Sequence, residues 1–241
     1  MHSETHTDLL IIGGGSMGLV AADYLVASSG ANGQPAVRVL DAHRPPHDQG
    51  AHHGETRLIR LAYGEGSGYV SLALRALERW RELERETGES LFLPTGVLNL
   101  GPASAPFIQQ VEASARQYDL PLEGLDGSAA SERWPGWRLD ASMRGGFESR
   151  AGVLRVERII ECWRQRVERS ANVTLTSGAR VVRLEPLKQG GYAATCDDGR
   201  RFSADRLLVS AGQHVAPLLA ELGIELPLTR VRKTFAWFEA D

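Results

Sequence analysis

Asp8-Leu-Leu-Ile-Ile-Gly-Gly-Gly-Ser-Met-Gly18 is the stretch that decides the fold of this 241-residue chain. Its apolar part, residues 8–12, is typical of a buried parallel strand, and residues 19–27 continue as a helix. Between them, Gly13, Gly15 and Gly18 have the G-x-G-x-x-G spacing of a dinucleotide-binding turn. The stretch therefore predicts the strand–turn–helix unit that opens a doubly wound α/β fold.

Each glycine of this turn has its own physical role. We expect Gly13 to permit the tight turn, Gly15 to let the backbone approach a pyrophosphate, and Gly18 to let the helix pack closely on the strand. A second strand over residues 37–40 ends in Asp41, whose carboxylate suits the ribose hydroxyls of an adenosine. The alternative, a glycine-rich turn without a ligand, is disfavoured by this context. The pattern predicts an adenine-dinucleotide site.

Composition excludes several other classes. The chain is 42% hydrophobic and 24% charged, as is ordinary for a globular protein, and its net charge of -3 gives no reason to expect nucleic acid or an anionic membrane as partner. Cys162 and Cys196 are too few and too far apart to indicate a metal site or a disulfide framework. The N-terminus lacks a signal-peptide pattern, and no apolar run approaches the roughly 18 residues of a membrane span. We therefore expect a cytoplasmic protein.

Other elements follow from periodicity and turn residues. Two prolines, two glycines and four histidines predict a loop over residues 41–57. A hairpin over residues 190–202 would turn at the Asp-Gly pair that ends at Gly199. The remaining expected helices are 69–86, 107–118 and 154–168, and the remaining expected strands are 92–100, 173–176, 181–184, 206–210 and 231–239.

The segment after Asp41 resembles the monomeric sarcosine oxidase and N-methyltryptophan oxidase family of flavoenzymes. The matching residues are Asp41-Ala-His, Pro45-Pro-His, Gly50-Ala-His-His-Gly-Glu-Thr-Arg-Leu-Ile-Arg60, Ala62-Tyr-Gly-Glu-Gly66 and Tyr69-Val. The resemblance continues through Thr95-Gly-Val-Leu-Asn-Leu-Gly101, Arg133-Trp-Pro135, Val209-Ser-Ala-Gly212 and Val231-Arg-Lys-Thr-Phe-Ala-Trp237, so it covers essentially the whole chain. Asn99-Leu-Gly-Pro102 and the run from Val231 favour the N-methyltryptophan oxidase branch.

The resemblance implies a fold and an activity. It implies a Rossmann-like FAD-binding domain over residues 1–90 and 150–222. An interleaved, here incomplete, antiparallel-sheet substrate domain would cover residues 91–149 and 223–241. The implied enzyme takes a hydride equivalent from an N-methyl amino acid, such as N-methyl-L-tryptophan or sarcosine, to N5 of FAD. Imine hydrolysis and reoxidation by oxygen then give the primary amine, formaldehyde and hydrogen peroxide. The full-length enzyme would be a monomer.

The resemblance also implies residue roles. His53 and Arg57 match residues beside the flavin ring, and Arg60 matches the arginine that binds the substrate carboxylate. A guanidinium offers a carboxylate two parallel donors, and a cation near the flavin would stabilise the charge that hydride transfer builds. Without the resemblance, structural salt bridges would be the favoured interpretation of both arginines. The implied cofactor contacts are Gly13, Gly15, Ser16, Met17, Gly18, Asp41, Ala42, His52, Thr56, Val181, Ala211 and Gly212.

Three further expectations concern what this chain lacks. The loop histidines have no cysteine beside them and no carboxylates at ligand spacing, so we expect no metal. The family's flavin-attaching cysteine and its two active-site lysines would lie beyond this segment, because Cys162, Cys196, Lys188 and Lys233 match none of them. We therefore expect an N-terminal portion of an N-methyl amino acid oxidase that is poorly active alone.

Two alternatives remain open. In the first, the chain is a non-catalytic FAD-binding fragment or half of a split flavoprotein. In the second, it is a nicotinamide-dependent dehydrogenase that uses the same glycine pattern. The dehydrogenase is disfavoured, because Asp41 is followed by the flavin-oxidase loop rather than by further strand–helix units.

Overall fold

A computed structural model describes residues 5–29, 33–54, 56–231, 234 and 236 of the chain. These residues belong to two compact units, Met1–Gly54 with Val156–Thr234 and Glu55–Arg155 with Phe235–Asp241. No helix in the described part of the chain combines the length and the apolar character that a membrane span requires.

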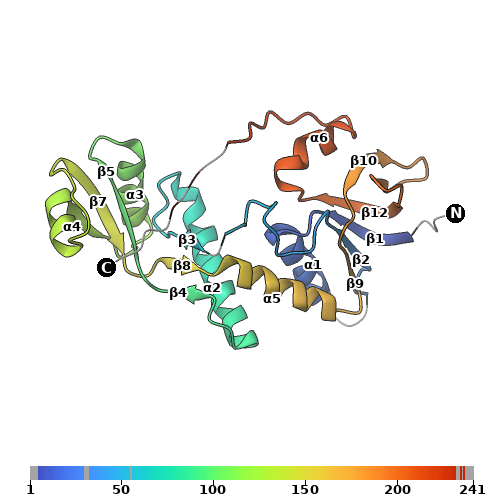
Figure 1. Ribbon diagram of the computed structural model, residues 1–241, viewed down its shortest axis with the longest axis horizontal. Helices are drawn as coiled ribbons and strands as arrows, with labels where there is room; N and C mark the ends of the chain where they lie inside the picture. Colours follow the sequence, from blue (N-terminus) through green and yellow to red (C-terminus); the bar gives the residue numbers. More distant parts are fainter. Residues whose placement is uncertain (1–4, 30–32, 55, 232–233, 235, 237–241) are drawn as a thin grey trace. The chain divides into compact units, whose positions relative to one another are not determined.

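The first unit is built on a six-stranded mixed sheet with the order β10-β11-β12-β1-β2-β9 (Figure 1). β1 lies inside the sheet and pairs in parallel with β12 on one side and with β2 on the other, and β9 extends the parallel part beyond β2. β11 and β10 are added to β12 in antiparallel fashion. The strands are β1 (Thr5–Ile12), β2 (Val37–Leu40), β9 (Val173–Thr176), β10 (Val181–Pro186), β11 (Tyr192–Cys196) and β12 (Arg201–Val209).

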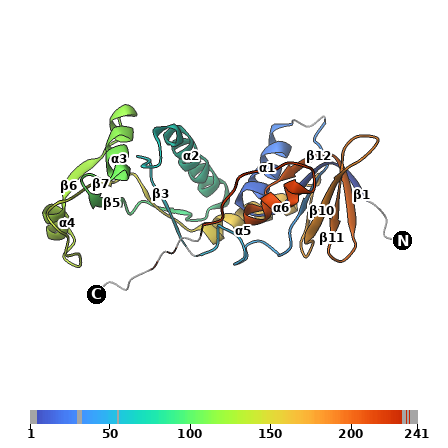
Figure 2. The same cartoon turned by 90° about the horizontal axis from the view of Figure 1, so that it is seen from above.

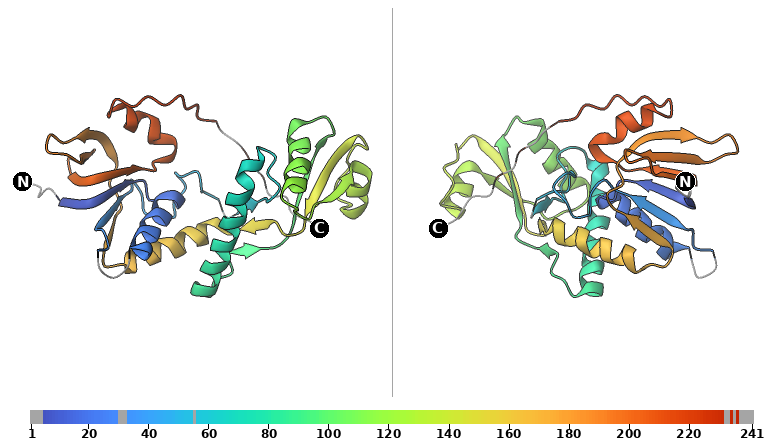
Figure 3. Two further views of the ribbon diagram at one scale, coloured as in Figure 1. Left: turned by 180° about the vertical axis from the view of Figure 1, so that it is seen from behind. Right: turned by 45° about the vertical axis from the view of Figure 1, so that its right-hand side comes forward.

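Alternate residues of β1 supply the cores on the two faces of this sheet. Leu9 and Ile11 point to the face covered by α1 (Ser16–Ser28) and α5 (Val156–Arg169), which run side by side (Figure 3). Leu10 and Ile12 point to the opposite face, where they share a core with Leu218 of α6 (Val215–Ala220). A strand with both faces covered is apolar throughout, which explains why residues 9–12 form one hydrophobic run.

The second unit has two small antiparallel sheets, in the orders β3-β8-β4 and β5-β7-β6. Helix α3 packs against β5 and β7, and α4 packs against β6 and β7 (Figure 2). Its strands are β3 (Arg57–Ile59), β4 (Phe92–Leu93), β5 (Val97–Pro102), β6 (Glu123–Asp126), β7 (Met143–Glu148) and β8 (Gly152–Leu154). Its helices are the 3-10 turn η1 (Ser67–Tyr69), α2 (Val70–Thr87), α3 (Pro106–Gln117) and α4 (Gly127–Arg133).

The predicted α/β class and most of the predicted elements are confirmed, with three corrections. The strand expected over residues 92–100 is two strands in different sheets, since the chain turns at Gly96, whose φ is 74°. Leu154 belongs to β8 rather than to the helix that follows, because it pairs with Arg57 and Phe92. Residues 206–210 do not start a new strand: 206–209 are the end of β12, which also forms the second arm of the predicted hairpin.

The sequence patterns did not predict several of the observed elements. β7 contains Gly145 and Gly146, which have low strand propensity, but a Cβ on Gly145 would lie 1.7 Å from the Asn99 carbonyl oxygen of the neighbouring strand. Glycine is required there by the close approach of two backbones, which no local pattern reveals. β6, β8, α4 and α6 were missed for their shortness. Of the strand expected over 231–239, residues 232, 233, 235 and 237–239 lie outside the described residues.

The compact units are divided at other residues than the expected FAD-binding and substrate domains, whose boundaries at residues 90 and 150 stay a prediction. The first unit ends at Gly54 and resumes at Val156. The physical reason is strand pairing, since β3 pairs with β8 and α2 packs against β4, which ties residues 57–87 to the second unit.

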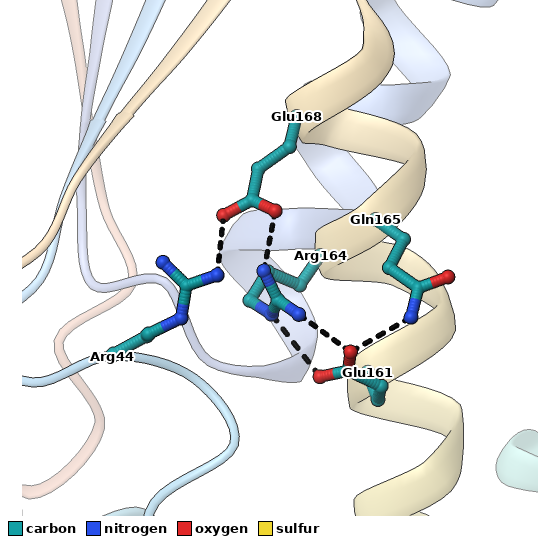
Figure 4. A network of polar contacts seen from close by, with 5 residues as sticks. All are labelled: Arg44, Glu161, Arg164, Gln165 and Glu168. Carbon is teal, nitrogen blue, oxygen red and sulfur yellow. Dashed lines mark hydrogen bonds and ion pairs between the residues drawn. The ribbon is translucent and has the colours of Figure 1, made fainter.

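A network of charged side chains covers α5 (Figure 4). The guanidinium of Arg164 donates to both oxygens of Glu161 and to Glu168, and Arg44 lies 3.2 Å from the other oxygen of Glu168. The Arg164 side chain is only 10% exposed. Its hydrogen bonds hold the pKa of Glu161 below the ordinary value, and they raise the pKa of Arg164 itself. The ion pairs are thus favourable to the folded state at neutral pH.

We expect Arg164→Met to lower the free energy of unfolding by about 2 kcal/mol at pH 7, because two partly buried carboxylates lose their donor. Because the pKa of Glu161 is lower in the folded state, its contribution is full above the ordinary glutamate pKa of about 4.3 and is lost as the pH falls through the lowered value. Urea unfolding of wild type and variant between pH 7 and pH 3 checks this, with exposed Arg169→Met on the same helix as control. A difference that stays constant down to pH 3 would contradict it.

Candidate functional site

The turn after β1 is closed against the end of β12. Gly13 has a φ of 103°, and a Cβ added to it would lie 2.6 Å from the Ser210 carbonyl oxygen. A Cβ on Gly18 would lie 1.9 Å from the Gly13 oxygen, and the Ser210 hydroxyl donates to that same oxygen at 2.9 Å. No side chain fits at either glycine, so α1 can begin directly against the strand ends. Ser210 was not among the sequence-based candidates.

Gly15 differs from these two glycines. It precedes α1 with a φ of -72°, and a Cβ there would make an ordinary contact with His52 at 3.4 Å. The protein alone therefore does not require glycine at this position. No side chain caps α1, its first turn contains no acidic residue, and Met17 is 75% exposed. The N–H groups of this first turn are suited to an anion such as a diphosphate.

Asp41 lies where β1, β2 and β9 end. Its carboxylate is buried and accepts the Gly14 N–H at 2.6 Å through Oδ2 and the His43 N–H at 2.8 Å through Oδ1. Its own main chain donates to Thr176 and accepts from Ala179. A carboxylate has about four lone-pair sites, so these bonds leave capacity for ribose hydroxyls. The carboxyl edge of a parallel sheet is where such folds bind nucleotides.

The other expected dinucleotide residues of the first unit lie near this edge. Val181 starts β10, two residues after Ala179, and packs with Ala211 against the core that contains Ile12 and Leu40. Gly212 has a φ of 53° and starts the 3-10 turn η2 (Gly212–His214). The cofactor candidates from this unit are therefore grouped around the ends of β1, β2 and β12; they are Gly13, Gly15, Ser16, Met17, Gly18, Asp41, Ala42, His52, Val181, Ala211 and Gly212.

Two of the loop histidines differ in exposure. His52 is buried beside Gly50, whereas the His53 side chain is 52% exposed, with Nδ1 3.6 Å from a carboxylate oxygen of Glu157. Within the described residues, no group of three or more histidines, cysteines or carboxylates is placed to hold a metal ion.

The expected flavin-side and substrate residues Thr56, Arg57 and Arg60 belong to the second unit. Arg57 begins β3 and donates to the Thr56 carbonyl oxygen at 2.9 Å. The Arg60 guanidinium lies 2.7 Å from the Glu65 carboxylate and about equally far from two ring centres, 5.4 Å from Tyr63 and 5.3 Å from Phe107. The aromatic rings hold the guanidinium while its edge binds a carboxylate.

Glu148 is a further residue that sequence reasoning missed. It is 2% exposed, and one carboxylate oxygen accepts the N–H groups of Leu61 at 2.8 Å and Ala62 at 2.7 Å. The other oxygen accepts from the Asn99 amide at 2.8 Å. The carboxylate thereby fixes the backbone that follows Arg60. Its partners lie at least 49 residues away in sequence, so no local pattern identifies it.

Comparison with known proteins shows what this geometry belongs to. Residues 8–240 match the family described as FAD dependent oxidoreductase. The chain belongs to that family. The adenine dinucleotide that the sequence predicts is therefore FAD, and the glycine turn, the N-terminus of α1 and Asp41 fit its diphosphate and ribose.

The curated relatives bear the name of one oxidase. The chain is 43% identical over 234 residues to N-methyl-L-tryptophan oxidase of Citrobacter koseri and 44% identical over 235 residues to that of Salmonella arizonae. Each match covers 97% of this chain and 60% of the relative. The chain thus spans 60% of the length of these relatives. These matches confirm that the chain resembles oxidases of this name.

Solved structures confirm the Rossmann-like fold. NikD, an unusual amino acid oxidase essential for nikkomycin biosynthesis, superposes with a TM-score of 0.78 at 25% identity, over 91% of this chain and 55% of that one. Glycine oxidase from Geobacillus kaustophilus superposes with a TM-score of 0.70 at 20% identity, over 94% of this chain and 60% of that one.

Two glycine variants should distinguish a glycine that the protein fold requires from a glycine that only the bound FAD requires. We expect Gly18→Ala to destabilise the fold by about 3 kcal/mol or more, because its Cβ meets backbone at 1.9 Å. Gly15→Ala should melt within about 2 °C of wild type, since a 0.3 kcal/mol change is about 1 °C in a domain of this size, but should bind FAD at least tenfold more weakly. Thermal melts and flavin-fluorescence titrations check both, with Gly136→Ala, which has open space, as control. Equal FAD affinity in Gly15→Ala would contradict the expectation.

Glu148 variants should report on the segment that carries Arg60. Glu148→Ala leaves two buried N–H groups without an acceptor, so we expect a loss of about 3 kcal/mol in unfolding free energy. Glu148→Gln should lose about 1 kcal/mol, because its oxygen can serve both N–H groups and Asn99 can turn its amide oxygen toward the new NH₂. Urea unfolding checks this order, and equal losses in the two variants would contradict it.

Proposed function

We propose that this chain serves the FAD-dependent oxidative demethylation of an N-methyl amino acid, with N-methyl-L-tryptophan favoured over sarcosine. The products would be the amino acid, formaldehyde and hydrogen peroxide. The observation that carries the proposal is the identity of 43–44% to N-methyl-L-tryptophan oxidases over 97% of the chain. The geometry of the glycine turn agrees with the proposal. Gly13 packs closely against Ser210 and the Gly14 N–H donates to the Asp41 carboxylate, an arrangement that suits an adenine dinucleotide.

In this proposal the first unit holds the cofactor. The first-turn N–H groups of α1 would bind the diphosphate, Asp41 the ribose, and the backbone near Val181 and Gly212 the adenosine half and its phosphates. Ala42 and His52 would complete the cofactor contacts of this unit, and Thr56 would be a cofactor contact from the second unit. FAD, when bound, supplies the acceptor for a hydride equivalent from the carbon next to the substrate nitrogen.

The second unit would supply the substrate carboxylate site. The Arg60 guanidinium lies 2.7 Å from the Glu65 carboxylate in an exposed ion pair. A substrate carboxylate can take the place of Glu65 in this pair. Tyr63 and Phe107 would keep the guanidinium in place during the exchange. Arg57 would stabilise negative charge at the flavin ring, and His53 would contact that ring. A cytoplasmic location and a monomeric full-length enzyme belong to the same proposal.

Non-covalent cofactor binding is part of the proposal for this chain. Both cysteines are buried, and burial raises the pKa of the Cys196 thiol to about 11. A thiol that remains protonated at neutral pH is a poor nucleophile. The Cys196 thiol is therefore not suited to attach a flavin.

The experiment is a visible absorbance spectrum of the purified 241-residue protein with added FAD, repeated on the supernatant after acid precipitation. We expect a flavin spectrum from the protein and full release of the colour by acid. Peroxide formation with N-methyl-L-tryptophan and with sarcosine then measures turnover and substrate preference. Flavin without peroxide would favour the alternative of a non-catalytic FAD-binding fragment, and no flavin binding would overturn the proposal.

Arg60 and Glu65 variants test the substrate site. We expect Arg60→Lys to weaken binding of N-methyl-L-tryptophan about 10- to 100-fold, because lysine lacks the planar pair of donors. Glu65→Gln should tighten binding about two- to fivefold, since it removes the competing carboxylate. Perturbation of the flavin spectrum by the amino acid measures both affinities. Weaker binding of N-methyl-L-tryptophan by Glu65→Gln would contradict the proposal that the substrate carboxylate replaces Glu65 at Arg60.

A further inference from the structure

His47 contacts Asp41 inside the loop that follows β2. Its Nδ1 accepts the Gln49 main-chain N–H at 3.2 Å, and its Nε2 lies 3.3 Å from Asp41 Oδ1. The two side chains are 15% and 9% exposed, so the contact is largely withdrawn from water. Neither the glycine pattern nor the expected site residues include His47.

The Gln49 bond decides which nitrogen of His47 carries the proton. A nitrogen that accepts an N–H must keep its lone pair, so the neutral ring carries its proton on Nε2. That proton faces the Asp41 carboxylate. Nε2 is buried and, among the described atoms, has no partner in hydrogen-bonding geometry, so the nearby Asp41 oxygen is the acceptor within reach.

We propose that His47 is a positioning residue that holds the Asp41 carboxylate for the ribose of FAD. The inference rests on the proposed function, because it requires the dinucleotide to bind at Asp41. The carboxylate accepts two main-chain hydrogen bonds, from Gly14 and His43, and His47 Nε2 faces it from 3.3 Å. With these groups on its two oxygens, the carboxylate cannot turn without losing an interaction. Such preorganisation lowers the free-energy cost of ordering the site when the ligand binds.

The surroundings of His47 agree with this role. The rings of His43 and His52 lie at centroid distances of 5.1 and 5.5 Å, so a charged His47 would sit between two further imidazoles. A second proton on His47 would have to go to Nδ1, where the Gln49 N–H points. Nδ1 is thus engaged as an acceptor, and Nε2 is the nitrogen that faces Asp41.

The test is a set of position-47 variants with ADP as a probe for the adenosine half. We expect His47→Ala to raise the dissociation constant for ADP about tenfold. His47→Gln should stay within about twofold of wild type, because its amide nitrogen reaches the place of Nε2, whereas His47→Asn should resemble His47→Ala. His43→Ala is the matched control, since its main-chain donor to Asp41 remains. Wild-type affinity in His47→Ala, or equal losses in the Gln and Asn variants, would overturn the proposal.

A double-mutant cycle separates positioning from a direct contact. If His47 acts through Asp41, His47→Ala should cost no more than about twofold in the Asp41→Asn background. A tenfold loss in that background would overturn the proposal. Melting temperatures of all variants identify any that fail to fold.

The ring nitrogens of His47 supply a readout that needs no cofactor. Nitrogen NMR of the ligand-free chain should show the neutral tautomer with the proton on Nε2, and a proton on Nδ1 would overturn the inference. If wild type bound neither ADP nor FAD, the proposed function would fail, and the tautomer would still decide the inference about His47.

Discussion

The hydrogen bond from the Gly14 N–H to the Asp41 carboxylate joins the ends of β1 and β2, two neighbouring parallel strands of the first unit. The bond is possible only because the turn after β1 lies in close contact with the end of β12, where Gly13 and Gly18 leave no room for side chains. An ionised acceptor makes this bond stronger than one between neutral groups. The position of α1, and with it the anion-binding end of the helix, depends on this arrangement.

The two units use a buried carboxylate in the same way. Asp41 accepts main-chain N–H groups at the turn that would bind the dinucleotide, and Glu148 accepts two main-chain N–H groups directly after Arg60. In each case an acid fixes a loop that carries candidate site residues. A buried charge is costly unless donors surround it, and here N–H donors meet both oxygens of each carboxylate. Loops that bear candidate site residues are thereby fixed by hydrogen bonds to a buried charge.

The features of the first unit that depend on local sequence could be predicted. The glycine spacing, the apolar run before it and the position of Asp41 are local patterns, and strands β1 and β2 and helix α1 follow from them. The strand with Gly145 depends on two backbones that meet across a sheet, and the strand break at Gly96 depends on a turn with positive φ, so periodicity missed both. Glu148 and His47 were missed for a related reason. Their importance lies in partners that folding brings together, whereas the sequence shows only an acid after a glycine-rich segment and one histidine among several.

A crystal structure of the 241-residue protein with FAD bound would show where the diphosphate and the ribose lie. We expect the diphosphate within hydrogen-bond distance of the first-turn N–H groups of α1, and ribose hydroxyls on the Asp41 carboxylate while the Gly14 bond is kept. A diphosphate bound away from the turn at Gly13–Gly18, or an Asp41 carboxylate that does not contact the ribose, would contradict it.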